Sequence, residues 1–129
     1  MSQVPVIKGA HHVAQIEYHI VFCPKWREPC MVDYRGVLVY KSILKQCERG
    51  QIIVRSLNVQ PDHVHLICSI PPKIAVADAI GCIKSGSSST LGLHSYYGQR
   101  SWSRGYFCST VGIDNDSVRR YVNTQGRGG

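Results

Sequence analysis

Two histidines separated by one residue, His63 and His65, have the spacing of paired metal ligands. Alternate side chains of a β-strand point to the same face, so both imidazoles would face one side of a strand and Val64 the other. Tyr121 and Gln125 are four residues apart, a spacing that makes them neighbours on one face of a helix. Together these residues offer ligands for a metal ion and a phenol for nucleophilic attack.

The phenol of Tyr121 needs assistance, because a tyrosine with an ordinary pKa of ~10 is a poor nucleophile at neutral pH. A metal ion held by His63 and His65 would favour the phenolate. Neutral imidazoles suit Mn²⁺, Zn²⁺ and similar ions, and the amide oxygen of Gln125 is a hard ligand compatible with Mg²⁺ or Mn²⁺. Because none of these ligands is anionic, the ion would keep its full charge and could polarise a phosphodiester oxygen.

The periodicity of apolar residues, and the glycines and prolines that interrupt it, predict the helices and strands that position these residues. The turn Gln60-Pro61-Asp62 joins two strand-like runs into an antiparallel hairpin and places His63 at the start of the second strand. Predicted strands cover residues 13–22, 52–59, 63–70 and 105–110, and predicted helices cover 34–49 and 74–85. A last predicted helix begins at capping residues within 114–117 and runs through Tyr121 to about Gln125. This order predicts an α+β, ferredoxin-like fold with a split β-α-β arrangement: an antiparallel sheet with helices on one face, plus a C-terminal helix that carries Tyr121.

Composition narrows the class of protein further. A chain of 129 residues is expected to form a single domain over residues 1–129. Fifteen Lys and Arg against eight Asp and Glu give a net charge of +7, which favours a polyanionic partner such as nucleic acid. The apolar stretches are too short to cross a membrane, so a cytoplasmic protein with no membrane partner is expected. The six cysteines contain no C-x-x-C pair and are expected to be reduced and mostly buried.

The hairpin and the last helix also carry a family resemblance. Pro61-Asp62-His63-Val64-His65-Leu66 resembles the histidine-hydrophobic-histidine motif of the HUH endonuclease superfamily. Arg120-Tyr121-Val122-Asn123-Thr124-Gln125 resembles the helix motif of its single-tyrosine, TnpA-type transposases. Further agreement extends over nearly the whole chain, through Lys8–His12, Tyr18–Phe22, Lys84–Ser88 and Trp102–Gly112.

The resemblance implies specific roles. Such transposases recognise hairpins of single-stranded DNA, cut beside them with the tyrosine, retain the 5′ phosphate as a phosphotyrosine and release a 3′ hydroxyl, without ATP. By position, Tyr121 is the nucleophile, and His63, His65 and Gln125 are ligands of Mg²⁺ or Mn²⁺. Basic residues within the matching motifs, Lys84, Arg104 and Arg120, are candidate DNA contacts. The family also implies a homodimer with composite active sites in trans.

Other interpretations stay open at this stage. As an isolated pair, His63 and His65 could be structural, Tyr121 could be a core aromatic, and Gln125 could be a surface amide. His11, His12, His19 and His94 are assigned a structural or DNA-facing position rather than a metal. Two further function classes are a non-catalytic single-stranded nucleic-acid-binding module and a metal-dependent phosphoesterase that uses water. A covalent protein–DNA adduct that depends on Tyr121 distinguishes the transposase from both.

Overall fold

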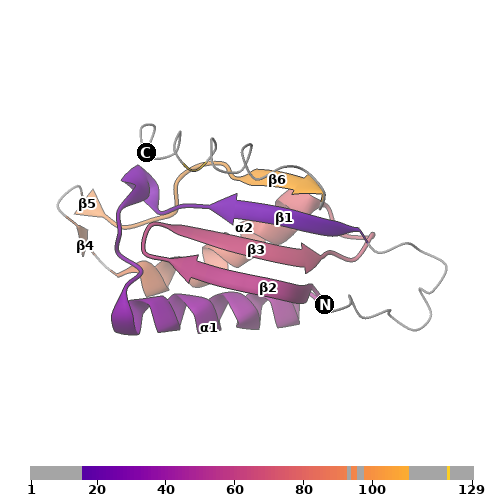
Figure 1. Cartoon of the computed structure of the whole chain (residues 1–129), viewed down its shortest axis with the longest axis horizontal. Helices are drawn as coiled ribbons and strands as arrows, with labels where there is room; N and C mark the ends of the chain where they lie inside the picture. The colour runs from indigo at the N-terminus through magenta and orange to yellow at the C-terminus, as the bar shows by residue number, and fades with distance from the viewer. Residues whose placement is uncertain (1–15, 93, 96–97, 111–121, 123–129) are drawn as a thin grey trace.

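A four-stranded antiparallel sheet forms the centre of the protein (Figure 1). The computed structural model describes residues 16–92, 94–95, 98–110 and 122 of the chain. The strands follow the order β2-β3-β1-β6 across the sheet. Their bounds are β1 Glu17–Phe22, β2 Ile53–Gln60, β3 His63–Ser69 and β6 Phe107–Thr110.

Two helices connect these strands and lie on the same face of the sheet (Figure 1). Helix α1, Asp33–Arg49, lies between β1 and β2 in the chain, and helix α2, Val76–Ser87, lies between β3 and β6. With β1 in the middle, paired to β3 and β6, this is the split β-α-β arrangement of the ferredoxin-like fold. The predicted α+β class, the antiparallel sheet and the placement of the helices on one face are therefore confirmed.

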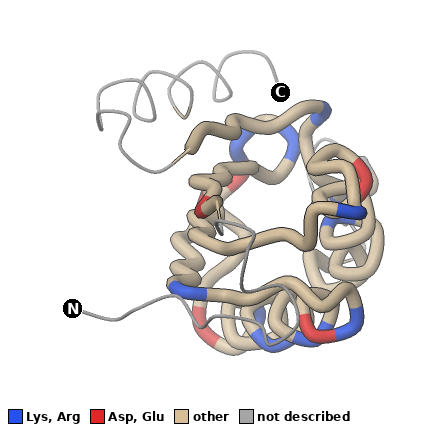
Figure 2. Tube along the Cα trace, turned by 90° about the vertical axis from the view of Figure 1, so that its right-hand side faces the viewer, with Lys and Arg blue, Asp and Glu red and all other residues tan. Residues whose placement is uncertain are grey.

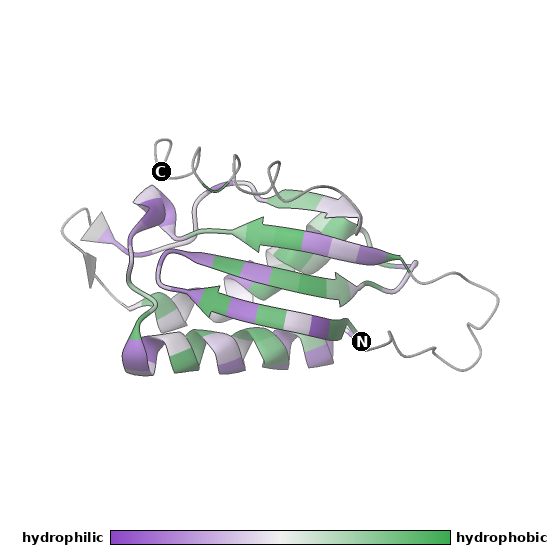
Figure 3. Cartoon of the chain, viewed as in Figure 1, coloured by the Kyte–Doolittle hydropathy of each residue, from purple (hydrophilic) through white to green (hydrophobic). Residues whose placement is uncertain are grey.

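The two faces of the sheet differ in character because hydrophobic and hydrophilic side chains alternate along the strands (Figure 3). The helix-covered face holds the main core, which has apolar residues of β1 and β3 against residues of α1 and α2. Its fully or almost fully buried members include Ile20, Phe22, Val39, Ile43, Val64, Leu66, Cys68, Ile80 and Ile83. Helices α1 and α2 do not cover the opposite face, and both His63 and His65 lie there.

Leu66 provides a test of this core. Its side chain is fully buried and lies between Ile20 of β1 and Leu57 of β2. We expect Leu66→Ala to lower the free energy of unfolding by about 2–5 kcal/mol, because truncation removes apolar contacts and leaves a cavity. Urea denaturation measures the change, with Ser56→Ala on the exposed side of β2 as the control. A loss from Leu66→Ala no larger than that of the control would contradict the core assignment.

Some elements differ from the sequence-based expectation. Two short 3-10 helices, η1 Lys25–Arg27 and η2 Ser88–Leu91, occupy segments for which the sequence predicted no helix or strand. The same is true of a small hairpin of β4 His94–Ser95 and β5 Gly98–Gln99. Such short elements contain too few residues for periodicity to reveal them. The predicted C-terminal helix lies outside the described residues except for Val122, which has helical backbone. Within the described ranges, no helix has the length and apolar character to span a membrane.

All six cysteines are free thiols, in agreement with the sequence analysis. Burial raises the pKa of Cys23 and Cys68 to about 12 and that of Cys47 to about 11. Cys82 is the exposed one. We therefore expect a thiol reagent such as DTNB to modify Cys82 rapidly and the buried thiols only on unfolding, because the thiolate is the reactive species. Loss of the fast phase in Cys82→Ser would confirm the assignment; an unchanged fast phase would contradict it.

Candidate active site

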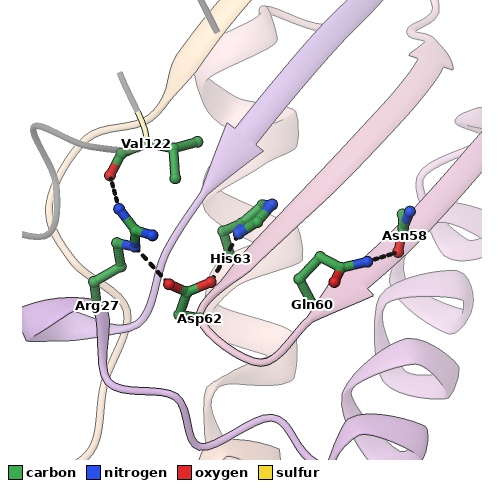
Figure 4. A network of polar contacts seen from close by, with 6 residues as sticks. All are labelled: Arg27, Asn58, Gln60, Asp62, His63 and Val122. Atoms are coloured by element: carbon green, nitrogen blue, oxygen red, sulfur yellow. Dashed lines mark hydrogen bonds and ion pairs between the residues drawn. The ribbon is translucent and has the colours of Figure 1, made fainter. Parts of the chain in front are cut away.

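The face of the sheet opposite the helices carries His63 and His65. In β3, His63 pairs with Gln60, and His65 lies between Asn58 of β2 and Val21 of β1. Val64 between them is fully buried in the core, so the predicted alternation is confirmed and the two imidazoles share the outer face. Beside them, the side-chain amide of Gln60 donates a 2.6 Å hydrogen bond to Asn58 Oδ1 (Figure 4).

A third imidazole, that of His19, contacts His65. His19 lies on β1 opposite Ile67, two pairs along from Val21 and His65, so its side chain points to the same face as that of His65. The ring centroids are 4.2 Å apart with an interplanar angle of 33°, and Nε2 of each ring faces Nε2 of the other. Two neutral imidazoles in this arrangement can share a proton or direct their lone pairs at one cation.

The electrostatic environment keeps these rings neutral. Burial, followed by the proximity of His19 and His63, lowers the pKa of His65 to about 4. Burial also lowers the pKa of His19. A neutral imidazole is the form that ligates a metal, because protonation occupies the nitrogen lone pair.

The imidazole of His63 is hydrogen-bonded to the carboxylate of Asp62. Its Nδ1 lies 2.9 Å from Oδ1 of Asp62, and the other oxygen of Asp62 accepts a 2.6 Å hydrogen bond from Arg27 Nε (Figure 4). Burial alone would raise the pKa of Asp62, but the hydrogen bonds from His63 and Arg27 and the positive charge of Arg27 outweigh it and lower the pKa. The carboxylate is therefore ionised and can only accept hydrogen bonds, so His63 Nδ1 is the donor.

Arg27 extends this network to the C-terminal part of the chain. Its Nη1 donates a 2.9 Å hydrogen bond to the main-chain carbonyl of Val122 (Figure 4). The Val122 side chain is buried and packs with Val21 and Phe107 on the outer face of the sheet. Val122 follows Tyr121 directly in the sequence, so the network joins the histidine face to the residue after the predicted nucleophile.

Of the other sequence-predicted site residues, the structure describes Lys84 and Arg104. Tyr121, Gln125 and Arg120 lie outside the described residues. Lys84 of α2 is half-buried and donates 2.8 Å hydrogen bonds to the carbonyls of Ser103 and Gly105, and burial lowers its pKa. It fixes the loop before β6. Arg104, in that loop, is exposed. Contact of these basic residues with DNA stays a prediction.

The donors present fit a metal ion that takes part of its coordination from the described chain. His63 and His65 offer two imidazoles on one face, and Asp62 orients that of His63. Among the described residues, no group of three or more His, Cys, Asp or Glu forms a metal-binding cluster. A complete set therefore needs a ligand of another kind, and the amide of Gln125 is the predicted one.

His19 and Arg27 are the members of this site to which sequence reasoning gave no catalytic role. For His19, the signal was its parity within Tyr18–Phe22, because the buried residues Ile20 and Phe22 assign residue 19 to the outer face. No local pattern identifies Arg27, because its partners Asp62 and Val122 are 35 and 95 residues away in the sequence.

The fold and the outward-facing histidine pair define an α+β protein with a polar site on the face of its sheet that α1 and α2 do not cover. The family model described as IS200-like transposase matches residues 12–125, and the chain belongs to this family. It is 31% identical over 124 residues to the transposase of insertion sequence IS200 from Salmonella typhimurium, covering 90% of this chain and 80% of that one. It is also 28% identical over 126 residues to the ISDra2 transposase TnpA of Deinococcus radiodurans, covering 92% and 89%.

Solved structures agree on the fold. A crystal structure of a protein assigned as a transposase from Deinococcus radiodurans R1 superposes with a TM-score of 0.82 at 22% identity, covering 93% of this chain and 98% of that one. A REP-associated tyrosine transposase bound to a REP hairpin superposes with a TM-score of 0.60 at 14% identity, covering 95% of this chain and 69% of that one. The chain thus has the family's fold over nearly its whole length.

Proposed function

We propose that this member of the family cleaves and rejoins single-stranded DNA at hairpin-bearing insertion-sequence ends through a 5′-phosphotyrosine at Tyr121. The observation that carries the proposal is the paired imidazoles of His63 and His65 on the sheet face opposite α1 and α2, both presented by one strand. The sequence adds a tyrosine and a glutamine at helical spacing in the family's order. This combination supports phosphoryl transfer rather than simple DNA binding.

In the proposed reaction, the phenol oxygen of Tyr121 attacks a DNA phosphorus atom. A tyrosine–phosphorus bond forms as the bond from phosphorus to the 3′ oxygen breaks, and the departing oxygen takes up a proton to become a 3′ hydroxyl. A second 3′ hydroxyl then attacks the phosphotyrosine and releases the phenol. One phosphodiester is exchanged for another, so no ATP is needed.

Mg²⁺ or Mn²⁺ is the proposed cofactor, with His63, His65 and Gln125 as its ligands. When bound, it would supply positive charge to the scissile phosphate. The contribution of the described chain is to hold the imidazole of His65 neutral and to orient the imidazole of His63. Burial keeps the pKa of His65 at about 4, and Asp62 accepts the Nδ1 proton of His63.

Single-stranded DNA with hairpin ends is the proposed partner. The relative whose structure contains a REP hairpin supports this choice. Lysines and arginines lie on several elements of the described chain rather than in one stripe (Figure 2), so the surface suits contacts to a folded DNA backbone from more than one side. Lys84, Arg104 and Arg120 are the proposed DNA contacts, with Lys84 acting mainly through the loop that it holds.

The proposed assembly is a homodimer, and the origin of the tyrosine in each site is testable. The family resemblance implies a trans arrangement, in which each site combines the histidines of one subunit with the tyrosine of the other; the alternative is a cis arrangement within one subunit. A heterodimer of one Tyr121→Phe subunit and one His63→Ala subunit distinguishes them. A trans enzyme retains one intact site in this heterodimer and cleaves, whereas a cis enzyme retains none.

The function is tested with a labelled single-stranded hairpin substrate incubated with the protein and Mg²⁺ or Mn²⁺. We expect a DNA adduct that resists denaturing electrophoresis and is absent when EDTA is added. A metal-dependent phosphoesterase would cut the DNA and leave no adduct, and a non-catalytic binding module would shift the hairpin in a native gel without cutting it. Either outcome, with a protein shown to be folded, would contradict the proposal.

A further inference from the structure

The Arg27–Asp62 pair contacts both a site histidine and the C-terminal part of the described chain. Two other ion pairs are Arg55–Glu17 at 2.6 Å and Arg100–Glu28 at 3.2 Å. The Arg27–Asp62 pair, at 2.6 Å, adds His63 on one side and the carbonyl of Val122 on the other (Figure 4). Its carboxylate and guanidinium are each about one quarter exposed, similar to those of Arg100–Glu28, which makes the latter pair a suitable control.

Asp62 determines which nitrogen of His63 is available. An ionised carboxylate accepts but cannot donate, so it stabilises the tautomer with hydrogen on Nδ1. That tautomer leaves the lone pair on Nε2, the nitrogen turned away from Asp62. A carboxylate behind a ligating imidazole also raises the basicity of the ligand and fixes the orientation of its ring.

Main-chain hydrogen bonds hold the segment around Arg27 in place. Arg27 N–H donates to the carbonyl of Pro24 within this segment. On either side of Arg27, Lys25 N–H donates to the carbonyl of Ser101, and Met31 N–H donates to the carbonyl of Pro61 in the β2–β3 turn. Trp26 and Arg27 both have left-handed backbone, with φ of 64° and 51°. Non-glycine residues rarely adopt this conformation, and it persists where surrounding structure enforces it.

We propose that Arg27 and Asp62 are positioning residues that couple the metal-ligating face of His63 to the chain segment next to Tyr121. Asp62 sets the tautomer of His63 through one oxygen and is held by Arg27 through the other. The planar guanidinium of Arg27 binds both the carboxylate and the Val122 carbonyl, which a lysine could not do with the same geometry. This inference rests on the proposed function for its catalytic meaning, but the placement of the groups is independent of it.

The Asp62 part is tested in Asp62→Asn, with Glu28→Gln as the matched control in the neighbouring ion pair. The amide can turn its NH₂ towards Nδ1 and so stabilise the opposite tautomer. ¹⁵N NMR of the metal-free protein, with the His63 signals identified by their loss in His63→Ala, should show Nδ1–H in the wild type and in Glu28→Gln. In Asp62→Asn we expect the Nε2–H tautomer to appear and Mn²⁺ affinity, measured by EPR, to fall by about 10–100-fold.

The Arg27 part is tested with Arg27→Gln and Arg27→Lys against Arg100→Gln. Both Arg27 variants should increase hydrogen exchange in peptides that contain Val122, because neither preserves both hydrogen bonds. At saturating Mn²⁺ they should slow single-turnover adduct formation by about 10–100-fold, the scale associated with a small misplacement of reacting groups. Arg100→Gln should change neither quantity.

The outcomes separate this inference from the proposed function. If the wild type forms no DNA adduct, the proposed function fails, while the tautomer, Mn²⁺ affinity and hydrogen exchange still judge the positioning pair. If the wild type forms the adduct but Asp62→Asn keeps the wild-type tautomer and Mn²⁺ affinity, the role of Asp62 is wrong. If Arg27→Gln matches Arg100→Gln in exchange and rate, the role of Arg27 is wrong.

Discussion

Tyr121→Phe is expected to abolish the covalent protein–DNA adduct and to reduce strand cleavage by at least about 10⁴-fold, the scale on which removal of a nucleophile lowers turnover. Phenylalanine retains the ring but has no oxygen to bond to phosphorus. Single-turnover assays on a 5′- or 3′-labelled hairpin measure both losses. Binding of the hairpin, followed by fluorescence anisotropy, should stay within a few-fold of the wild type.

The matched control is Tyr34→Phe, because Tyr34 is a highly exposed tyrosine at the beginning of α1, on the helix that covers the opposite face of the sheet. It should cleave and form the adduct as the wild type does. Persistent adduct in Tyr121→Phe would mean that a different residue is the nucleophile. Cleavage that persists without any adduct would instead identify water as the nucleophile and support the phosphoesterase class.

His63→Ala and His65→Ala form the second pair of large-effect variants. Each removes one of the two proposed imidazole ligands, and we expect each to lower adduct formation by at least about 10²-fold, comparable to removal of one group that stabilises transition-state charge. Because both side chains lie on the outer face of β3, away from the apolar core, the loss should occur in a folded protein. Circular dichroism and thermal unfolding check that condition.

Asn58→Ala is the control for these variants, since Asn58 is exposed on the same face and pairs with His65 across β2 and β3. Raising the Mn²⁺ concentration should partly restore activity to a variant that keeps one imidazole, but should not restore the double variant His63→Ala, His65→Ala. Wild-type rates in either single variant would contradict the assignment of these histidines as ligands.

The local features of the fold were predictable because they depend on neighbours in the sequence. Alternation assigned His63 and His65 to one face, and the turn at Pro61 and Asp62 predicted the hairpin that the structure contains. The periodicity of α1 predicted its end at Arg49. In these segments burial and local propensity point to the same structure, which is why their sequence pattern is informative.

The contacts that organise the site were not predictable in the same way. The meeting of His19 and His65 depends on the register between β1 and β3, which pairs Val21 with His65; a shift by one residue would turn His19 to the other face. The bridge from Arg27 to Asp62 depends on two consecutive left-handed residues in a short segment. Lys84 likewise had the character of a surface cation in the sequence, but in the structure its ammonium group donates hydrogen bonds to the main-chain carbonyls of Ser103 and Gly105.

The most direct measurement is the mass of the nucleotide-bearing peptide from the purified adduct. After nuclease and trypsin digestion, cleavage after Arg120 and Arg127 would release residues 121–127, in which Tyr121 is the sole tyrosine. We predict that tandem mass spectrometry finds a 5′-linked nucleotide on Tyr121 in this peptide, and that the modification is absent without Mg²⁺ or Mn²⁺. A nucleotide on any other residue, or efficient cleavage with no modified peptide, would contradict the proposed mechanism.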